Sequence, residues 1–295
     1  MGEKKVDISV VIPTRDVGAL LRNQLASLAL QDYVGSWEVV IADNGSTDDT
    51  VEIAMNAARN LPMPVRVVHA THARGANVAR NAGARVARGN VLLFCDGDDE
   101  TSPQWVRTMG GALEAADIVG GTLDFGRLNA PRAMAWSFRV PSAIQEYRGF
   151  RYALSANLGL RATLFEELNG FDESFRGGFD EVEFGYRAAR ADCVLREASG
   201  AIVHYRLRPT RRTLFRQRFR YGVTSRQFLA KYPELHDPKI DPLRRQLRTV
   251  LAQTLRVGMY AFGPRTTRDG YIATLAYEVG VLTALIGEKS HRPAN

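Results

Sequence analysis

Residues 8–46 read ISVVIPTRDVGALLRNQLASLALQDYVGSWEVVIADNGS and contain two apolar runs separated by a helical pattern. The runs Ile8–Ile12 and Glu38–Ala42 are short and rich in β-branched residues, as in buried strands. Between them, apolar residues recur at helical spacing over Val17–Leu30. A strand, a helix and a second strand in this order are typical of a βαβ unit, whose two strands lie parallel in one sheet.

The same alternation continues as far as residue 115. Two further strands and three further helices are predicted, at Val65–His69, Val91–Cys95, Asp49–Arg59, Asn77–Arg88 and Pro103–Ala115. Ser46, followed by Asp49 three residues later, resembles a capping box at the start of the second helix. The sequence therefore predicts an α/β fold with a Rossmann-like, mostly parallel central sheet flanked by helices.

Polar residues follow three of these strands directly. The strand ends read Pro13-Thr14-Arg15, Asp43-Asn44-Gly45-Ser46 and Asp96-Gly97-Asp98-Asp99. In open α/β sheets, ligands bind outside the carboxyl ends of the strands. We therefore expect the functional site at this edge of the sheet.

Composition and missing motifs exclude several classes of protein. The 295 residues are 45% hydrophobic and 24% charged, which is typical of a globular protein rather than a disordered one. Cys95 and Cys193 form no disulfide framework, and no signal peptide is evident, so we expect a cytoplasmic protein. The formal net charge of +7 suits an anionic partner. The first strand-to-helix turn lacks the glycine pattern of dinucleotide sites, and no P-loop is found.

The strongest chemical signal is the acidic run Asp96-Gly97-Asp98-Asp99 after an apolar strand. Asp96 and Asp98 alternate on an extended chain, so their side chains share one face and can hold one hard cation. Mg²⁺ and Mn²⁺ prefer such oxygen ligands and are commonly shared with substrate phosphates. The alternative is an acidic turn that caps the helix beginning at Pro103.

The chain resembles the family 2 inverting glycosyltransferases of the GT-A fold over about residues 6–206. Seven motifs carry this resemblance in the expected order: Ile8–Thr14, Ala42–Thr50, Gly75–Gly89, Leu92–Asp99, Asn157–Phe175, Asp180–Glu183 and His204-Tyr205-Arg206. The resemblance implies a metal-dependent enzyme that moves a sugar from a UDP- or dTDP-sugar to a hydroxyl acceptor.

For the donor nucleotide, the resemblance implies that Pro13, Thr14 and Arg15 line the cleft and that Asp96 and Gly97 also contact the donor. Asp43 would accept a hydrogen bond from the imide N–H of a uracil or thymine ring. Arg80 would lie near the diphosphate, although an arginine on a helix is often only a solvated charge.

For the metal, the resemblance identifies Asp96-Gly97-Asp98 as the family's DxD motif. Asp96 and Asp98 would bind Mn²⁺ or Mg²⁺ between the two donor phosphates, and the late His204 would complete the site. The alternative for His204 is a structural role.

For the chemistry, the resemblance points to the Asp180-Glu181-Val182-Glu183 run. The family usually has Glu-Asp-x-Asp/Glu here, with the second residue as the general base. Glu181 takes that position, and Asp180 remains an alternative because glutamate is one methylene longer than aspartate.

Two other functions are compatible with parts of the sequence. A sugar nucleotidyltransferase would need a Gly-rich, basic loop after the first strand, which Ile12–Gly18 does not provide. A nucleic-acid-binding protein could use Arg206–Arg226, which holds eight arginines and no acid. The acidic sheet end would repel that ligand, so we expect no nucleic-acid partner.

The predicted catalytic domain is residues 1–208, with a nucleotide-sugar half of about 1–100 and an acceptor half of about 101–208. Residues 209–295 form a basic helical extension. Its apolar stretch Tyr271–Gly287 falls short of the roughly 20 residues that a membrane span needs. Two alternatives stay open for Arg206–Arg226 and this stretch. They contact an anionic membrane peripherally, at its inner face, or they pack against the catalytic domain or against a second subunit in a homodimer.

Overall fold

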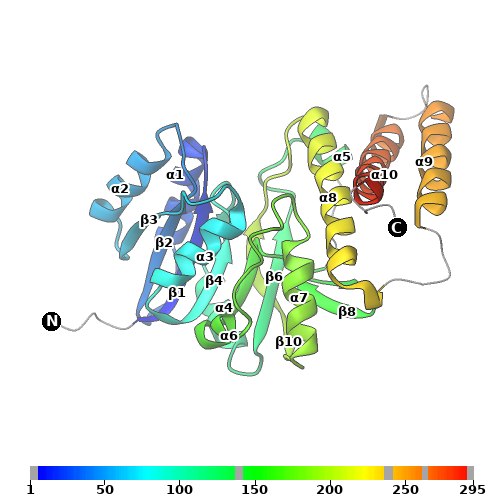
Figure 1. The fold of residues 1–295 in the computed structure, drawn as a ribbon. Helices are drawn as coiled ribbons and strands as arrows, with labels where there is room; N and C mark the ends of the chain where they lie inside the picture. The colour runs from blue at the N-terminus through cyan, green and yellow to red at the C-terminus, as the bar shows by residue number, and fades with distance from the viewer. Residues whose placement is uncertain (1–5, 137–141, 236–241, 261–264, 291–295) are drawn as a thin grey trace. The chain divides into compact units, whose positions relative to one another are not determined.

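The computed structural model describes residues 6–136, 142–235, 242–260 and 265–290 (Figure 1). The chain divides into two compact units. Residues 1–128, 140–176 and 180–206 form the first, which we call the sheet unit. Residues 129–139, 177–179 and 207–295 form the second, which we call the helical unit.

The sheet unit is built around one eight-stranded sheet. Its strands are, in spatial order, β3 (Val65–His69), β2 (Trp37–Asp43), β1 (Val6–Thr14), β4 (Gly89–Cys95), β9 (Asn157–Arg161), β6 (Ile118–Asp124), β10 (Leu195–His204) and β5 (Glu100–Thr101). The first four strands are parallel, and so are β6 and β10, whereas β9 and β5 run antiparallel to their neighbours. The predicted α/β fold with a mostly parallel sheet is confirmed.

Side-chain alternation along β1 separates two apolar cores, one on each face of the sheet. Val10 and Ile12 belong to one core, and Val11 belongs to the other. The first core packs under α1 (Gly18–Ala29), α2 (Thr50–Asn60) and α4 (Trp105–Ala112). The second lies against α3 (Ala76–Val86), α6 (Ala162–Glu167) and α7 (Asp180–Arg190). A separate hairpin of β7 (Ile144–Tyr147) and β8 (Phe150–Ala153) packs beside α7.

The helical unit contains α5 (Pro131–Trp136), α8 (Arg211–Lys231), α9 (Pro242–Met259) and α10 (Arg265–Ser290). Helices α8 and α10 approach closely at Gly222 and Gly280. A Cβ on Gly222 would lie 2.0 Å from the Tyr277 carbonyl oxygen, so only glycine permits this crossing. Two ion pairs, Arg211–Asp269 and Arg226–Glu288, join the same helices at 2.7 Å each. The arginine-rich stretch and the apolar stretch of the sequence therefore pack against each other.

Helix α10 is longer than the apolar stretch that the sequence suggests. Its segment Arg268–Glu288 has 21 residues and is long and apolar enough to cross a membrane, by length and composition alone. The sequence-based estimate was too short because the helix continues through the polar residues on both sides of Tyr271–Gly287. One such helix is weak evidence for a membrane span.

Candidate functional site

The ends of β1 and β4 meet at the carboxyl edge of the sheet. Gly97 is buried against β1, where a Cβ would lie 3.0 Å from the Thr14 methyl group. The Thr14 hydroxyl donates to the Ala42 carbonyl at 3.4 Å, and Pro13 beside it is partly buried. Arg15 is at the surface, with its Nε 3.7 Å from the Asp16 carboxylate. Four residues predicted to bind the donor, Pro13, Thr14, Arg15 and Gly97, thus belong to adjoining strand ends.

Asp43 is buried at the end of β2 and stabilises the turn that follows it. Its carboxylate accepts hydrogen bonds from the backbone N–H groups of Gly45 and Ser46, at 3.1 and 3.2 Å. The expected capping box is wrong: α2 begins at Thr50, and the side chain of Asp49 makes no capping hydrogen bond. Ser46 instead accepts a hydrogen bond from the backbone N–H of Asp16 at 3.0 Å.

Three carboxylates gather immediately after β4. One oxygen from each of Asp96, Asp98 and Asp99 lies within 4.8 Å of the others. Asp99 is buried, and its Oδ1 accepts the backbone N–H of Arg206 at 2.7 Å. Its buried Oδ2 has no hydrogen-bond partner among the described residues. Burial, together with the charges of Asp98 and Asp96, raises the pKa of Asp99 well above its ordinary value.

This acidic cluster fits a hard divalent cation. All three side chains offer oxygen ligands, which Mg²⁺ and Mn²⁺ prefer. A positive ion would also remove the mutual repulsion that raises the pKa of Asp99 and would give its buried oxygen a partner. The sequence indicated Asp96 and Asp98 as ligands, and the structure adds Asp99 as a third carboxylate.

Arg80 joins the acidic cluster to the first turn of α7. Its Nη2 donates to Asp96 Oδ1 at 2.9 Å, and its Nη1 donates to Asp180 Oδ2 at 3.0 Å. Only 6% of the Arg80 side chain is exposed, and the guanidinium lies 5.6 Å from the centre of the Phe171 ring. The sequence predicted Arg80 beside the donor diphosphate. The structure shows this guanidinium engaged with two carboxylates that are far apart in the sequence.

The three acidic residues that begin α7 differ in their surroundings. Asp180 is buried and held by Arg80. Glu183 is fully buried and pairs with Arg187 at 2.7 Å, and Arg187 also donates to the Gly170 carbonyl, so this pair is structural.

Glu181 is partly buried, and its pKa is raised well above its ordinary value. Burial is the main cause, followed by the neighbouring Asp180 carboxylate, while Arg80 acts in the opposite direction. The Glu181 carboxylate therefore binds a proton more tightly than an ordinary glutamate does.

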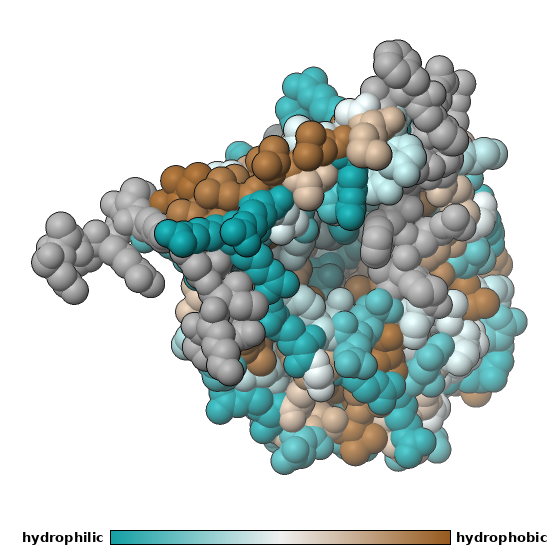
Figure 2. Space-filling view, turned by 90° about the vertical axis from the view of Figure 1, so that its right-hand side faces the viewer, coloured by the Kyte–Doolittle hydropathy of each residue, from teal (hydrophilic) through white to brown (hydrophobic). Residues whose placement is uncertain are grey.

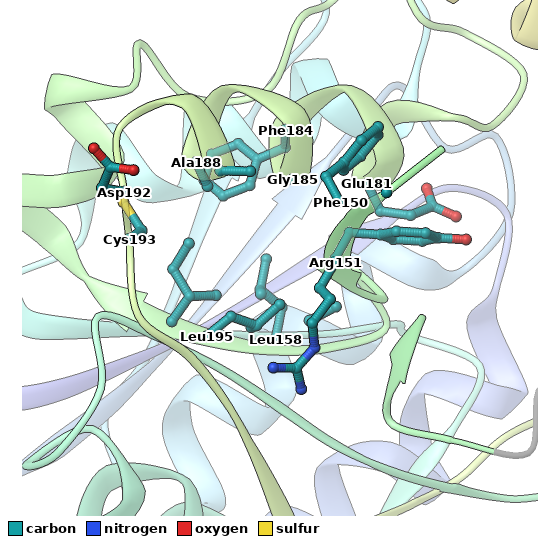
Figure 3. Close-up of a pocket in the computed structure, with 15 residues that line it drawn as sticks. Phe150, Arg151, Leu158, Glu181, Phe184, Gly185, Ala188, Asp192, Cys193 and Leu195 are labelled. Atoms are coloured by element: carbon teal, nitrogen blue, oxygen red, sulfur yellow. The ribbon is translucent and has the colours of Figure 1, made fainter. Parts of the chain in front are cut away.

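A cavity of about 380 Å³ lies along α7, with Glu181 at one end and Asp192 and Cys193 at the other (Figure 3). Phe184 and Ala188 of α7 form one wall, Phe150 and Arg151 of β8 form another, and Leu158 and Leu195 come from the sheet. Sequence reasoning missed the β8 residues, because no motif marks them and only the hairpin brings them to α7. The cavity, whose lining is both apolar and polar, offers space for a small molecule beside the Glu181 carboxylate.

His204 lies at the end of β10, opposite Glu100 of β5. Its Nδ1 is 2.6 Å from Asp124 Oδ2, and the side chain is 16% exposed. Backbone N–H donation from Gly126 and the contact with His204 lower the pKa of Asp124. Among the described residues, the cluster of Asp96, Asp98 and Asp99 does not include His204. Sequence reasoning missed Asp124, which is 80 residues away from its partner.

Comparison with known proteins identifies the family. The sequence model of glycosyl transferase family 2 matches residues 9–164. The chain is 31% identical to glycosyltransferase AglE of Haloferax volcanii over 225 residues, which cover 73% of this chain and 71% of AglE. It is 41% identical over 133 residues to the uncharacterized glycosyltransferase YibD of Escherichia coli, covering 45% of this chain but 35% of YibD.

A solved structure supports the fold. The mannosyltransferase PcManGT of Pyrobaculum calidifontis, determined in complex with GDP-Man and Mn²⁺, aligns with a TM-score of 0.67 at 18% identity. The alignment covers 97% of this chain and 89% of PcManGT. With the family model matching more than half of the residues, the chain belongs to glycosyl transferase family 2.

Proposed function

We propose that the protein is a metal-dependent, inverting glycosyltransferase that moves a sugar from a nucleoside-diphosphate sugar to a hydroxyl acceptor. The observation that carries this proposal is the pair of ion pairs made by Arg80. They hold the acidic cluster and the first turn of α7 next to each other, at 2.9 and 3.0 Å. A carboxylate set for a cation and a carboxylate with a raised pKa thus occupy one site, as this reaction requires.

The donor nucleotide would bind at the ends of β1 and β2. Pro13, Thr14 and Arg15 follow the buried part of β1, and Asp43 ends β2 in register with Thr14. The Asp43 carboxylate already accepts two backbone N–H groups but has further acceptor capacity for an imide N–H. An acceptor for an imide N–H favours a uracil or thymine base in the donor. Because PcManGT was determined with GDP-Man, a GDP-sugar is the donor to compare with UDP- and dTDP-sugars.

Asp96 and Asp98 would hold Mn²⁺ or Mg²⁺, with Asp99 and His204 as further ligands. When bound, the ion would neutralise the charge that develops on the departing nucleoside diphosphate. Arg80 keeps Asp96 in place from the protein side, and Arg206 fixes Asp99 through its backbone N–H. The complex of PcManGT with Mn²⁺ supports a divalent ion in this fold.

Glu181 would act as the general base. It accepts the proton of the acceptor hydroxyl while the acceptor oxygen bonds to the anomeric carbon and the bond from that carbon to the diphosphate oxygen breaks. Attack from the face opposite the leaving group inverts the anomeric configuration. Asp180 forms an ion pair with Arg80, whereas Glu181 lines the cavity in which we place the acceptor. A raised pKa increases the basicity of its carboxylate.

A donor panel tests this function. Thermal stability of the full chain is measured with UDP-, dTDP- and GDP-sugars, with and without Mn²⁺, for the native protein and Asp98→Ala. We expect one donor to stabilise the native protein only when Mn²⁺ is present, and Asp98→Ala to lose that effect while remaining folded without ligand.

Product analysis with the stabilising donor completes the test. Release of nucleoside diphosphate with an inverted anomeric linkage supports the proposal, whereas release of pyrophosphate would identify a nucleotidyltransferase. Equal stabilisation in excess chelator would contradict the metal requirement. For the division of labour along the chain, we propose residues 1–208 as the catalytic domain and 209–295 as an extension.

A further inference from the structure

Helix α9 exposes a row of large apolar side chains. Leu247, Leu251, Leu255 and Met259 are 50%, 61%, 60% and 77% exposed. They are spaced four residues apart, and each such step turns only about 40° around the helix axis, so they form one stripe. Single exposed apolar residues are ordinary, but a contiguous stripe marks an interaction surface.

The same helix is strongly basic. Four exposed arginines, Arg244, Arg245, Arg248 and Arg256, occur between Pro242 and Met259, and this segment contains no acidic residue. Figure 2 looks at the side on which α9 lies and shows hydrophobic side chains in a row bordered by hydrophilic ones.

The acidic residues of the neighbouring helix α10 are already engaged. Asp269 pairs with Arg211 and Glu288 pairs with Arg226, both on α8, while Glu278 accepts the side-chain amide of Gln246 at 2.7 Å. The neutral amide of Gln246 leaves the charge of the Glu278 carboxylate in place, but the exposed Arg245, Arg248 and Arg256 outnumber it beside the apolar stripe.

We propose that α9 is a docking surface for an anionic lipid bilayer. Apolar side chains of an interfacial helix enter the boundary between headgroups and acyl chains, and arginines next to them reach anionic headgroups. Arg248 projects about 60° from Leu251 around the helix, so its aliphatic stem can lie along the membrane surface while its guanidinium contacts phosphate. This inference does not depend on the proposed reaction.

Charge decides between a bilayer and the other occupants. A second copy docked through the same stripe would bring the arginines of two α9 helices together with no acid on either helix. Nucleic acid would satisfy the arginines but would leave the leucines and Met259 in water. An anionic bilayer accommodates both. The stretch Arg206–Arg226, which the sequence suggested for membrane contact, lies mostly in α8 and packs against α10. We therefore assign the membrane contact to α9 instead.

Vesicle co-sedimentation of the full chain tests the proposal. Vesicles of phosphatidylcholine alone are compared with vesicles that also contain phosphatidylglycerol, at low salt and in 0.5 M NaCl, where the Debye length is only about 4 Å. Two variants change the surface, Leu251→Ser with Leu255→Ser, and Arg245→Gln with Arg248→Gln. Two matched controls change exposed residues of the sheet unit, Leu30→Ser and Arg59→Gln.

We expect binding to the anionic vesicles, little binding to phosphatidylcholine, and loss of binding in high salt. Each neutralised arginine removes about a fivefold contribution, so the double arginine variant should bind about 25-fold more weakly. The leucine variant should also lose binding, and both controls should bind like the native chain.

Three results would overturn the proposal. One is binding that the α9 variants do not change, which would place the contact elsewhere, for example on α10. Another is the absence of binding at any salt concentration. The third is a dimer in solution that the leucine variant dissociates, since a second copy would then cover the stripe. Circular dichroism melts and donor binding of all variants show that the fold and the proposed donor site are intact.

Discussion

Replacing Glu181 by glutamine removes one proton-accepting group and keeps the size and most of the hydrogen bonding of the side chain. If Glu181 is the general base, the variant should bind the donor normally and transfer sugar slowly. Loss of a general base lowers kcat by roughly 10²–10⁴-fold, which corresponds to about 2.7–5.5 kcal/mol of activation free energy.

The same substitution should make the protein more stable at neutral pH. In the native chain the Glu181 carboxylate is partly removed from water and lies next to Asp180, and its pKa is raised for these two reasons. A desolvated polar group that is imperfectly compensated costs about 1–3 kcal/mol, and glutamine carries no charge to desolvate. At about 2–4 °C per kcal/mol for a unit of this size, the melting temperature should rise by about 2–12 °C.

The pH dependence of this gain has a definite sign. The folded native protein binds the Glu181 proton more tightly than the unfolded chain, whose glutamate has a pKa near 4.5. Glu181 therefore makes the native protein lose stability as the pH rises from about 4.5 through the raised pKa, and this contribution is missing from the glutamine variant. The difference between the two proteins should vanish below pH 4.5 and reach its maximum above the folded-state pKa. The raised pKa of Asp99 affects both proteins equally and cancels.

Denaturation of both proteins across this pH range, in chelator, measures the stability difference, and single-turnover transfer measures the chemical step. Asp180→Asn is the matched comparison, because it neutralises the adjacent carboxylate that Arg80 holds. A glutamine variant with native kcat would refute the assignment of the base. If only Asp180→Asn abolishes transfer, Asp180 is the base and the motif is displaced by one residue.

Two further predictions concern the side chains that hold the site together. Arg80→Met leaves Asp180 and Asp96 without their shared cation, so the free energy of unfolding should fall by about 3 kcal/mol. This value is the lower end for a broken buried pair, because the Asp96 side chain is 26% exposed. The control is Arg85→Met at an exposed position, and an unchanged melting temperature of Arg80→Met would contradict the prediction. Asp124→Asn weakens the support of the His204 ring at Nδ1 and should reduce Mn²⁺ affinity about 10–100-fold, measured by calorimetry without substrate. Native Mn²⁺ affinity in this variant would show that His204 is no ligand.

Much of the sheet could be predicted because local sequence and global fold agree there. The first four strands are short apolar runs that alternate with helical patterns, and helix positions deviate by only a few residues. The pairing of β1 with β4 joins strands that are not consecutive in the chain. The exceptions are local. The turn after β2 is stabilised by Asp43 rather than Ser46. The buried carboxylate has two oxygens, which accept the backbone N–H groups of Gly45 and Ser46, whereas a serine hydroxyl has only one oxygen.

The site could be predicted only in part, because its connections join distant residues. The acidic run is contiguous and easy to find, but the partners of its members, Arg80 and Arg206, come from two other segments. The second partner of Arg80, Asp180, comes from a third. A helical arginine reads as a solvated charge until the fold buries it between two carboxylates. The same holds for Asp124, an ordinary acid in the sequence that becomes the partner of His204 only where β6 and β10 end side by side.

Arg80 also explains how the site can concentrate so much negative charge. Asp96, Asp98, Asp99, Asp180 and Glu181 lie in one region of the sheet unit, and two of them have raised pKa values. Arg80 contacts one member of each group and therefore couples the position of the acidic cluster to that of the proposed base. A single guanidinium cannot neutralise five carboxylates, so the remaining charge favours a divalent ion at the acidic cluster and raises the affinity of the Glu181 carboxylate for a proton. The electrostatic cost of assembling the site thus produces the two properties that the proposed reaction uses.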